Sequence, residues 1–182
     1  PGSITLDGTE LLIADDLTID GDSDNDGTPD VTIDANQQSR VIRVESPNDA
    51  TVNLDSLIIT GGKVSDVNGG GILNRETRDI TNSIIRGNTA ETSGVIILLD
   101  GGGGIANDTT GKLTITRSII TGNSTDNDGG GIYAQGNAAN GATVTITDSW
   151  IYGNTAGDNG GGVANSVFIG GGGPLPDASV MN

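Results

Sequence analysis

The sequence predicts an all-β chain in which short strands stack, one turn upon the next, as a solenoid. Two motifs recur along it: a Gly triplet followed by an aliphatic residue, and an Ile-Thr-x-Ser-x-Ile-x-Gly-Asn block. The 182 residues are 33% hydrophobic yet only 2% aromatic, so the core must be built from Ile, Val and Leu, which favour strands. Fixed motifs at an irregular period are typical of fixed strands joined by variable loops.

The Gly triplets set the positions of the rungs, as we call the turns of the solenoid. They begin at Gly69, Gly102, Gly129 and Gly160, and extending their register toward the N-terminus puts rung starts near residues 11, 41, 71, 104, 131 and 162. The intervals between these starts are 30, 30, 33, 27 and 31 residues. We therefore expect one domain over residues 1–182, a solenoid of about six rungs in which 171–182 form a Gly- and Pro-rich tail.

Alternation along the strands assigns their faces. In 143–147, Val144 and Ile146 point to one face and the threonines to the other, as side chains do in a strand. The step from Ile146 to Ser149 breaks this alternation and indicates a corner. The inward columns are then Leu54/Ile80/Ile115/Ile146 and Ile59/Ile85/Ile120/Ile151.

A second corner is expected at the Gly-Asn pairs. Gly87-Asn88, Gly122-Asn123 and Gly153-Asn154 each end a repeat block. Gly tolerates the positive φ that a tight corner needs, and stacked Asn side chains can form a hydrogen-bonded ladder.

Composition excludes several function classes. The 24 acidic and 8 basic residues give a net charge of −16, which argues against binding nucleic acid through its phosphates. The chain has no His and no Cys, so Ser-His-Asp systems, Cys-His systems and His/Cys zinc sites are absent. Any metal must be a hard ion held by oxygen. No apolar run is long enough for a transmembrane helix.

The basic residues do not form a recognisable catalytic constellation, so we expect no catalytic residues and no enzyme. Arg75 and Arg78 are close in sequence and fall in what reads as a loop. The residues before the recurring Ser are Asn82, Arg117 and Asp148, and Ser56 takes this position in the earlier copy, where Leu57 replaces the Ser; the mixture is typical of a solvated face.

One acidic loop has the pattern of a calcium site. Residues 20–30 follow a D-x-D-x-D-G-x-x-D spacing that starts at Asp22, and alternating carboxylates can wrap Ca²⁺ while the Gly allows a tight turn. Position 12 is Ile33 rather than Glu, so this is not a complete EF-hand loop. A solvated acidic turn is the alternative. The candidate ligands are Asp22, Asp24, Asp26, Thr28 (through its carbonyl) and Asp30, with Asp20 and Asp34 as additional candidates.

Apolar residues also fall on faces expected to point outward. If the alternation holds, the column Ile58/Ile84/Ile119/Trp150 points outward, and Tyr152 lies on the same outward face as Trp150. An outward apolar stripe requires a cover. The cover is a partner, a sugar stacked on the aromatic rings, or the long loop after Asn88, which contains Val95, Ile96, Ile97, Leu98 and Leu99.

The repeats resemble a known group of proteins. The Gly-Gly-Gly-Ile-x-Asn blocks at 69–74, 102–107 and 160–165 (the last with Val for Ile), with the Ile-Thr-x-Ser copies, are similar to right-handed parallel β-helix proteins of bacterial surfaces. These include polymorphic outer-membrane-protein repeats and the wider pectin-lyase-like superfold. The resemblance covers roughly residues 4–170, and the third block departs from it at Tyr133-Ala134. It implies a right-handed parallel β-helix but leaves function open, because such folds include lyases, hydrolases, adhesins and stalks.

We expect an extracellular structural protein, a calcium-stabilised subunit that stacks end to end into a filament or surface layer. No capping helix precedes Ile4 or follows Phe168, and unpaired strand edges invite strand addition. One alternative is a stalk or passenger segment of a larger cell-surface adhesin. The other is a polysaccharide lyase or glycoside hydrolase of the pectin-lyase-like superfold.

The expected partners follow from that function. They are further copies in a head-to-tail homopolymer, with a cell-surface glycan as the second candidate, and neither nucleic acid nor a membrane span is expected. The expected location is extracellular or at the cell surface, as for a secreted bacterial protein. Sequons at Asn107 and Asn123 suit that location.

Overall fold

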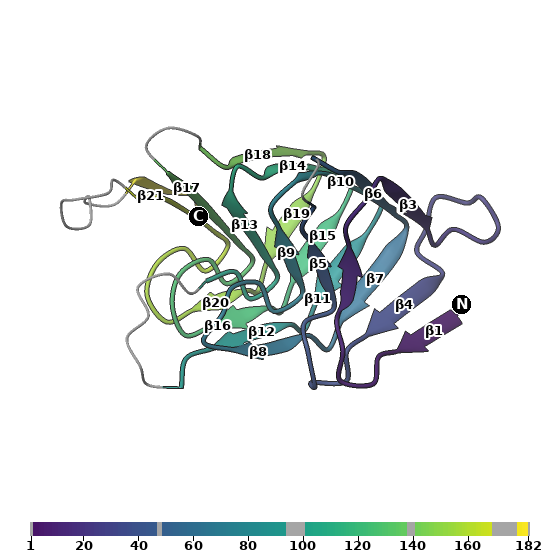
Figure 1. Ribbon diagram of the computed structural model, residues 1–182, viewed down its shortest axis with the longest axis horizontal. Coiled ribbons are helices and arrows are strands. Elements are labelled where there is room, and N and C mark those ends of the chain that lie inside the picture. The colour runs from purple at the N-terminus through teal and green to yellow at the C-terminus, as the bar shows by residue number, and fades with distance from the viewer. Residues whose placement is uncertain (1, 47–48, 94–100, 138–140, 169–177, 182) are drawn as a thin grey trace.

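The protein is a parallel β-solenoid of about five turns (Figure 1). The computed structural model describes residues 2–46, 49–93, 101–137, 141–168 and 178–181, and these ranges contain strands, turns and loops but no helix. The all-β solenoid predicted from the repeats is therefore confirmed.

Four sheets, here named A to D, run along the solenoid. Sheet A stacks β1 (Gly2–Thr5), β4 (Val31–Asp34), β7 (Leu57–Thr60), β11 (Ile84–Arg86), β15 (Ile119–Thr121) and β19 (Trp150–Tyr152). Sheet B stacks β2 (Leu11–Ile13), β5 (Ile42–Val44), β9 (Ile72–Asn74), β13 (Ile105–Thr109), β17 (Ile132–Asn137), β21 (Val163–Phe168) and β22 (Ala178–Met181). Sheet C stacks β3 (Leu17–Asp20), β6 (Thr51–Asp55), β10 (Thr77–Thr81), β14 (Lys112–Thr116) and β18 (Thr143–Thr147). Sheet D stacks β8 (Lys63–Ser65), β12 (Thr89–Glu91), β16 (Ser124–Thr125) and β20 (Thr155–Ala156).

Sheet B contains the expected rung starts. Its parallel strands begin at residues 11, 42, 72, 105, 132 and 163, each at or one residue after an expected start. Six passes through sheet B enclose about five turns, which accounts for the difference from the expected six rungs. The final strand, β22, lies within 171–182 and pairs antiparallel with β21.

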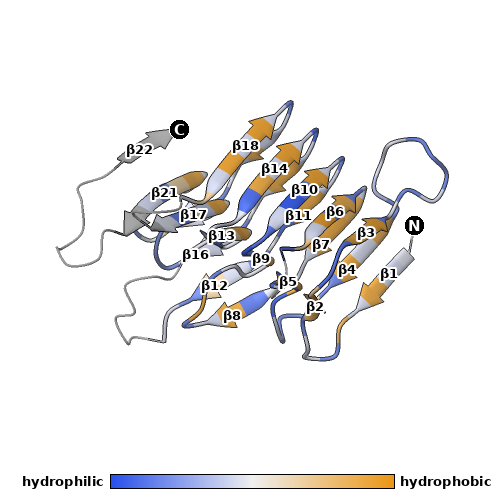
Figure 2. Ribbon diagram, turned by 45° about the horizontal axis from the view of Figure 1, so that its top comes forward, coloured by the Kyte–Doolittle hydropathy of each residue, from blue (hydrophilic) through white to orange (hydrophobic). Residues whose placement is uncertain are grey.

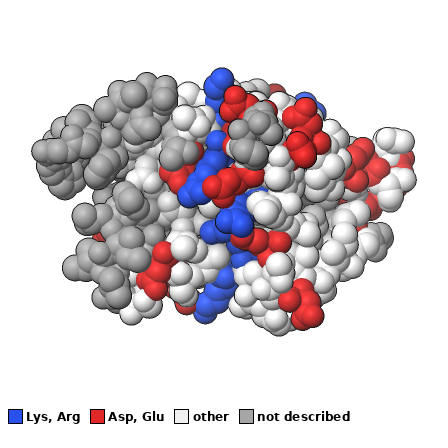
Figure 3. Space-filling view, in the orientation of Figure 1, with Lys and Arg blue, Asp and Glu red and all other residues white. Residues whose placement is uncertain are grey.

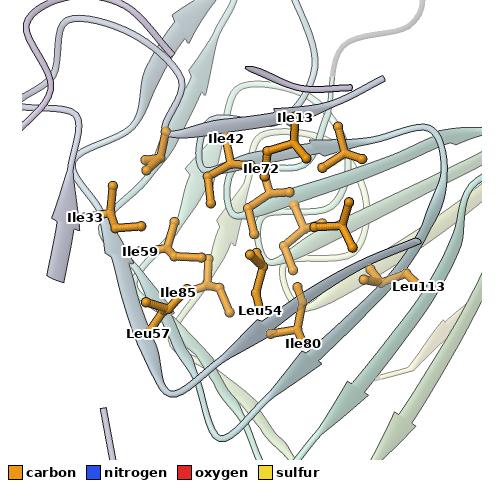
Figure 4. Close-up of a cluster of buried hydrophobic side chains, with 14 of the residues drawn as sticks. Ile13, Ile33, Ile42, Leu54, Leu57, Ile59, Ile72, Ile80, Ile85 and Leu113 are labelled. Atoms are coloured by element: carbon orange, nitrogen blue, oxygen red, sulfur yellow. The ribbon is translucent and has the colours of Figure 1, made fainter. Parts of the chain in front are cut away.

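The core is a stack of aliphatic columns. Both expected inward columns are in register across the strands, for example Leu54–Ile80–Ile115 in sheet C and Ile59–Ile85–Ile120 in sheet A, and these six side chains are buried. Figure 4 shows such side chains from different sheets meeting in one interior. Figure 2 shows the strands of sheet C side by side, with hydrophobic and hydrophilic residues alternating along them.

The expected corner between sheets C and A is held by a serine ladder. The hydroxyl of Ser118 donates to the carbonyl of Thr116 at 2.9 Å and accepts the backbone N–H of Ser83 at 3.1 Å. Ser83 and Ser149 repeat this pattern on the neighbouring rungs. The residue before each Ser turns the chain with a positive φ of 47–49°: Asn82, Arg117 and Asp148. Ser56 turns the same corner one rung earlier, with φ 52°.

An asparagine ladder forms where the Gly-Asn pairs predict it. The Nδ2 of Asn88 donates to Oδ1 of Asn123 at 3.0 Å, and the Nδ2 of Asn123 donates to Oδ1 of Asn154 at 3.0 Å. The same amides also bond backbone groups, such as the carbonyl of Ile85. Asn88 and Asn123 are buried, so the ladder satisfies polar groups that would otherwise be costly inside the solenoid.

The Gly triplets form the corner between sheets D and B. A Cβ built on Gly103 would lie 2.3 Å from the carbonyl oxygen of Ser124 and 2.6 Å from that of Gly130. Those distances leave no room for any side chain. The triplets are therefore required because the backbone of one rung packs directly on the backbone of the next.

Arg78 departs from the sequence-based interpretation. It lies in β10 rather than in a loop, and its side chain points inward, in register with Val52 and Leu113. The side chain has no exposed surface. Strand alternation counted from Ile80 places Arg78 inside, a position that a charged residue rarely occupies.

We predict that Asn123→Ala lowers the free energy of unfolding by about 3 kcal/mol, because it leaves several buried donors and acceptors unpaired. Denaturant unfolding followed by circular dichroism measures this change. Thr114→Ala, on the outer face of sheet C, is the control and should cost about 0.5 kcal/mol or less. Equal losses in the two variants would contradict a stabilising ladder.

Candidate metal centre

The acidic loop is an insertion at one corner of the solenoid. It joins β3 to β4 through residues 21–30, at the N-terminal end of the solenoid, on the right of Figure 1. The same corner is the single residue Ser56 between β6 and β7. The loop closes on itself because the N–H of Asp30 donates to the carbonyl of Gly21 at 3.0 Å, while the N–H of Gly21 donates to the carbonyl of Asp55 at 2.9 Å.

Three of the predicted ligands come together in this loop. Asp22, Asp24 and Asp30 each offer a carboxylate oxygen, and these oxygens lie within 4.8 Å of one another. Asp22 and Asp30 are half-buried and Asp24 is exposed. This is the one such group of acidic side chains among the residues that the structure describes.

Asp22 also shapes the loop. Its two carboxylate oxygens accept the N–H groups of Asp26 at 3.1 Å and Gly27 at 2.8 Å. Gly27 has a positive φ of 80°, as a tight turn around a bound cation requires. Asp30 accepts hydrogen bonds from the hydroxyl and the N–H of Ser23, which ties the two halves of the loop together.

The remaining predicted ligands lie outside the carboxylate group. Oδ1 of Asp26 accepts the N–H and hydroxyl of Thr28 at 2.8 and 2.5 Å. Oδ1 of Asp20 accepts the N–H of Asp22 at 3.0 Å. Asp34, at the end of β4, accepts the N–H of Asn36 at 2.7 Å. These carboxylates hold turns in the described structure.

Hydrogen bonding favours the charged forms of two clustered carboxylates. The N–H of Gly27 lowers the pKa of Asp22 below the ordinary 3.8. The side chain of Ser23 lowers the pKa of Asp30 in the same direction. Both groups are therefore ionised at neutral pH, where three close carboxylates repel one another unless a cation lies between them.

These residues fit a hard divalent cation. Ca²⁺ takes six to eight oxygen ligands from carboxylates, carbonyls and water. Three carboxylates on one short loop supply half of a six-ligand coordination shell, and water can supply the other ligands. A cation held there would join Asp22 and Asp24, on the outgoing half of the loop, to Asp30 at its base. It would thereby brace the corner between β3 and β4.

Acidic residues near the Gly triplets have other partners. Asp66 accepts the N–H of Ser93 at 2.8 Å, Asp126 accepts that of Thr92 at 2.9 Å, and Asp128 accepts that of Asn159 at 2.9 Å. Each of these carboxylates joins one rung to the next.

The expected interface column lies on the outer face of sheet A. Ile58, Ile84, Ile119 and Trp150 are in register across four strands. The three isoleucines are half-buried, whereas Trp150 is 70% exposed and Tyr152 55% exposed. The proposed cover Val95–Leu99 lies outside the described residues.

Both sequon asparagines are inside the solenoid. Asn107 and Asn123 are buried; Nδ2 of Asn107 donates to the carbonyls of Gly111 and Thr143, both at 2.9 Å. An amide held this way is not accessible for glycosylation in the folded chain. The sequons therefore do not indicate where in or outside the cell the protein is located.

Sequence reasoning missed an ionic ladder that crosses sheet B. Arg40 pairs with Glu10 at 2.5 Å, and Arg75 pairs with Glu45 at 2.8 Å and with Asp108 at 3.3 Å. Figure 3 shows Lys and Arg side chains gathered in a band across one face with acidic side chains among them. The signal in the sequence is the separation of the partners, 30, 30 and 33 residues, which matches the rung intervals.

Comparisons with known proteins do not identify the chain. No protein-family model, no curated protein and no solved structure gives a significant match. No helix capable of crossing a membrane occurs in the described part of the chain.

We predict that Asp24→Ala abolishes the calorimetric signal of Ca²⁺ binding. Asp24 belongs to the carboxylate group, and its removal leaves the loop-shaping bonds of Asp22 in place. Asp15→Ala removes an exposed carboxylate from a different turn and should leave the isotherm unchanged. An unaltered isotherm for Asp24→Ala would contradict the site.

We predict that Ca²⁺ affinity changes little between pH 8 and pH 5 and falls steeply below pH 4. Hydrogen bonds from Gly27 and Ser23 hold the pKa values of Asp22 and Asp30 below 3.8 in the folded loop. Both carboxylates therefore stay ionised down to pH 5, and protons compete with Ca²⁺ for them only at lower pH. Titrations at fixed ionic strength test this, and a loss of affinity between pH 7 and pH 5 would contradict it.

Proposed function

We propose that the protein is an extracellular structural subunit, a calcium-stabilised β-solenoid that associates head to tail with further copies of itself into a filament or surface layer. One observation carries the proposal. Inward-facing core side chains are exposed at both ends of the solenoid: Ile4 is 52% and Leu17 43% exposed at one end, and Ile146 is 36% exposed at the other.

The exposed residues belong to continuous columns. Ile4 is in register with the buried Ile33, Leu17 with the buried Val52, and Ile146 with the buried Ile115. Each column would continue across a head-to-tail contact. Exposed apolar surface of this kind favours burial against a matching surface.

The strand edges at the two ends are also compatible. Sheets A and C end at β19 and β18, and they begin at β1 and β3. A second copy placed with β1 on β19 and β3 on β18 would extend both parallel sheets and set Ile4 over Ile151. Sheet B differs, because its last strand is the antiparallel β22. A contact that joins two different ends does not close, and it generates a filament.

Calcium would act on the same contact. In that arrangement the acidic loop of one copy lies beside the last corner of its neighbour, which carries the exposed Asp148. Acidic groups brought together in this way repel, and a bound cation reduces the repulsion. The net charge of −16 makes this neutralisation more important than it would be for a balanced chain.

The resemblance to outer-membrane-protein-type repeats and to the pectin-lyase-like superfold supports a cell-surface location for such a subunit.

A stalk or passenger segment of a larger adhesin is the second candidate. The exposed rings of Trp150 and Tyr152 favour it, because they share the outer face of β19 beside the hydroxyl of Thr121. Aromatic rings next to polar groups suit the stacking of a sugar. In this alternative, further rungs rather than a second copy would cover the open ends.

We predict that the purified chain forms filaments in Ca²⁺ and that Ile146→Lys prevents their formation, because a charge would then be buried between copies. Negative-stain microscopy and sedimentation with and without a chelator measure assembly. Thr114→Lys adds the same charge to an outer face away from the ends and should leave filaments intact.

Monodisperse monomers of the unmodified chain in Ca²⁺ would overturn the filament and favour the stalk. Release of unsaturated uronides from an acidic polysaccharide would overturn the structural assignment in favour of a lyase.

A further inference from the structure

The interior of the solenoid contains one side chain that the structural function does not explain. Arg78 is buried completely, and none of its Nε, Nη1 and Nη2 atoms has a hydrogen-bond partner in the part of the chain that the structure describes. It is the largest of the fully buried side chains. The other arginines described above differ from it: Arg40 and Arg75 have carboxylate partners, and Arg86 is exposed.

No carboxylate among the described residues pairs with Arg78. Its column neighbours on the adjacent strands are Val52 and Leu113. Of the nearby acids, Asp79 is the next residue of the same strand and therefore faces outward. Glu76 uses Oε1 to accept the N–H of Ser46 at 3.0 Å. Arg78 thus lies between two apolar residues of its own column, and its guanidinium has no acceptor among the described residues.

A lone buried guanidinium is costly in two ways. Its five N–H donors lose their hydrogen bonds to water, and its charge loses the solvation that water provides. Burial lowers the pKa of Arg78 to about 9, which still leaves the group protonated at neutral pH. Loss of the proton therefore does not relieve the cost.

We propose that Arg78 binds a small monovalent anion, a halide such as chloride, inside the solenoid. Buried polar groups without protein partners commonly mark an ion or a water that completes the structure. A water would satisfy N–H groups but would leave the charge in place, whereas a halide supplies both an acceptor and the opposite charge. The ion would enter as the rungs around β10 fold.

The thermal stability of the purified chain should then depend on chloride. Unfolding is followed at constant ionic strength and constant Ca²⁺ while sodium chloride replaces sodium gluconate, whose anion is too large to be buried within a rung. Each tenfold rise in chloride above its dissociation constant should raise the Tm by about 3–6 °C. Arg78→Met should abolish this dependence, because an apolar side chain of similar length needs no counter-ion.

Arg86→Met is the matched control, since it removes one exposed positive charge from the neighbouring strand β11 and should keep the chloride dependence. Crystals grown in bromide supply a second readout that needs no variant. An anomalous peak within hydrogen-bond distance of the Arg78 nitrogens would support the site even if Arg78→Met fails to fold. A wild-type Tm that is the same in chloride and gluconate, or a bromide map without that peak, would overturn the proposal.

Discussion

Backbone hydrogen bonds between parallel strands place each position of one rung directly over the same position of the next, and this register governs every other feature of the molecule. A polar side chain that can bond the same position one rung away is stable inside: the hydroxyl of Ser118 accepts the backbone N–H of Ser83, and the side-chain amide of Asn88 donates to that of Asn123. Where opposite charges alternate at the rung interval, as from Glu45 to Arg75 to Asp108, the same register forms an ionic ladder. Where two backbones meet, as at Gly103, no side chain is tolerated.

Much of the fold could be predicted because the register of the strands is set by signals that lie close together in the sequence. Alternation around Ile80 and Ile115 identifies their strands, the extra residue before Ser149 reveals a corner, and the Gly-Asn pairs mark the next. Each signal lies within a few residues and is repeated, so an error in one copy is corrected by the others. The four sheets and their order could not be predicted in this way, because sheet D is absent from the first two passes and its strands are as short as two residues.

The candidate site was less predictable from the sequence. Spacing alone pointed to five ligands from Asp22 to Asp30, but the described loop gathers three carboxylates and turns Asp26 toward Thr28. Backbone N–H groups compete with an ion for the carboxylates of a short loop, and this competition decides which carboxylates turn away from the group. Arg78 was missed for another reason. Alternation places it inside, yet an unpaired cation in a core violates the expectation that residue type and position agree.

The corner between β3 and β4 shows that the number of residues in a corner can change without changing the register of the strands on either side. Ten residues (21–30) form this corner, whereas the next rung uses one, and the pairings on both sides, Asp20 with Asp55 and Val31 with Leu57, remain in register. The insertion also closes its own ends through Gly21 and Asp30, so its entropic cost rises only slowly with length. The corner can therefore gain or lose whole segments without a change in the core. In evolutionary terms it is a place where new binding loops can arise by insertion, and in engineering terms it is an attachment point for display.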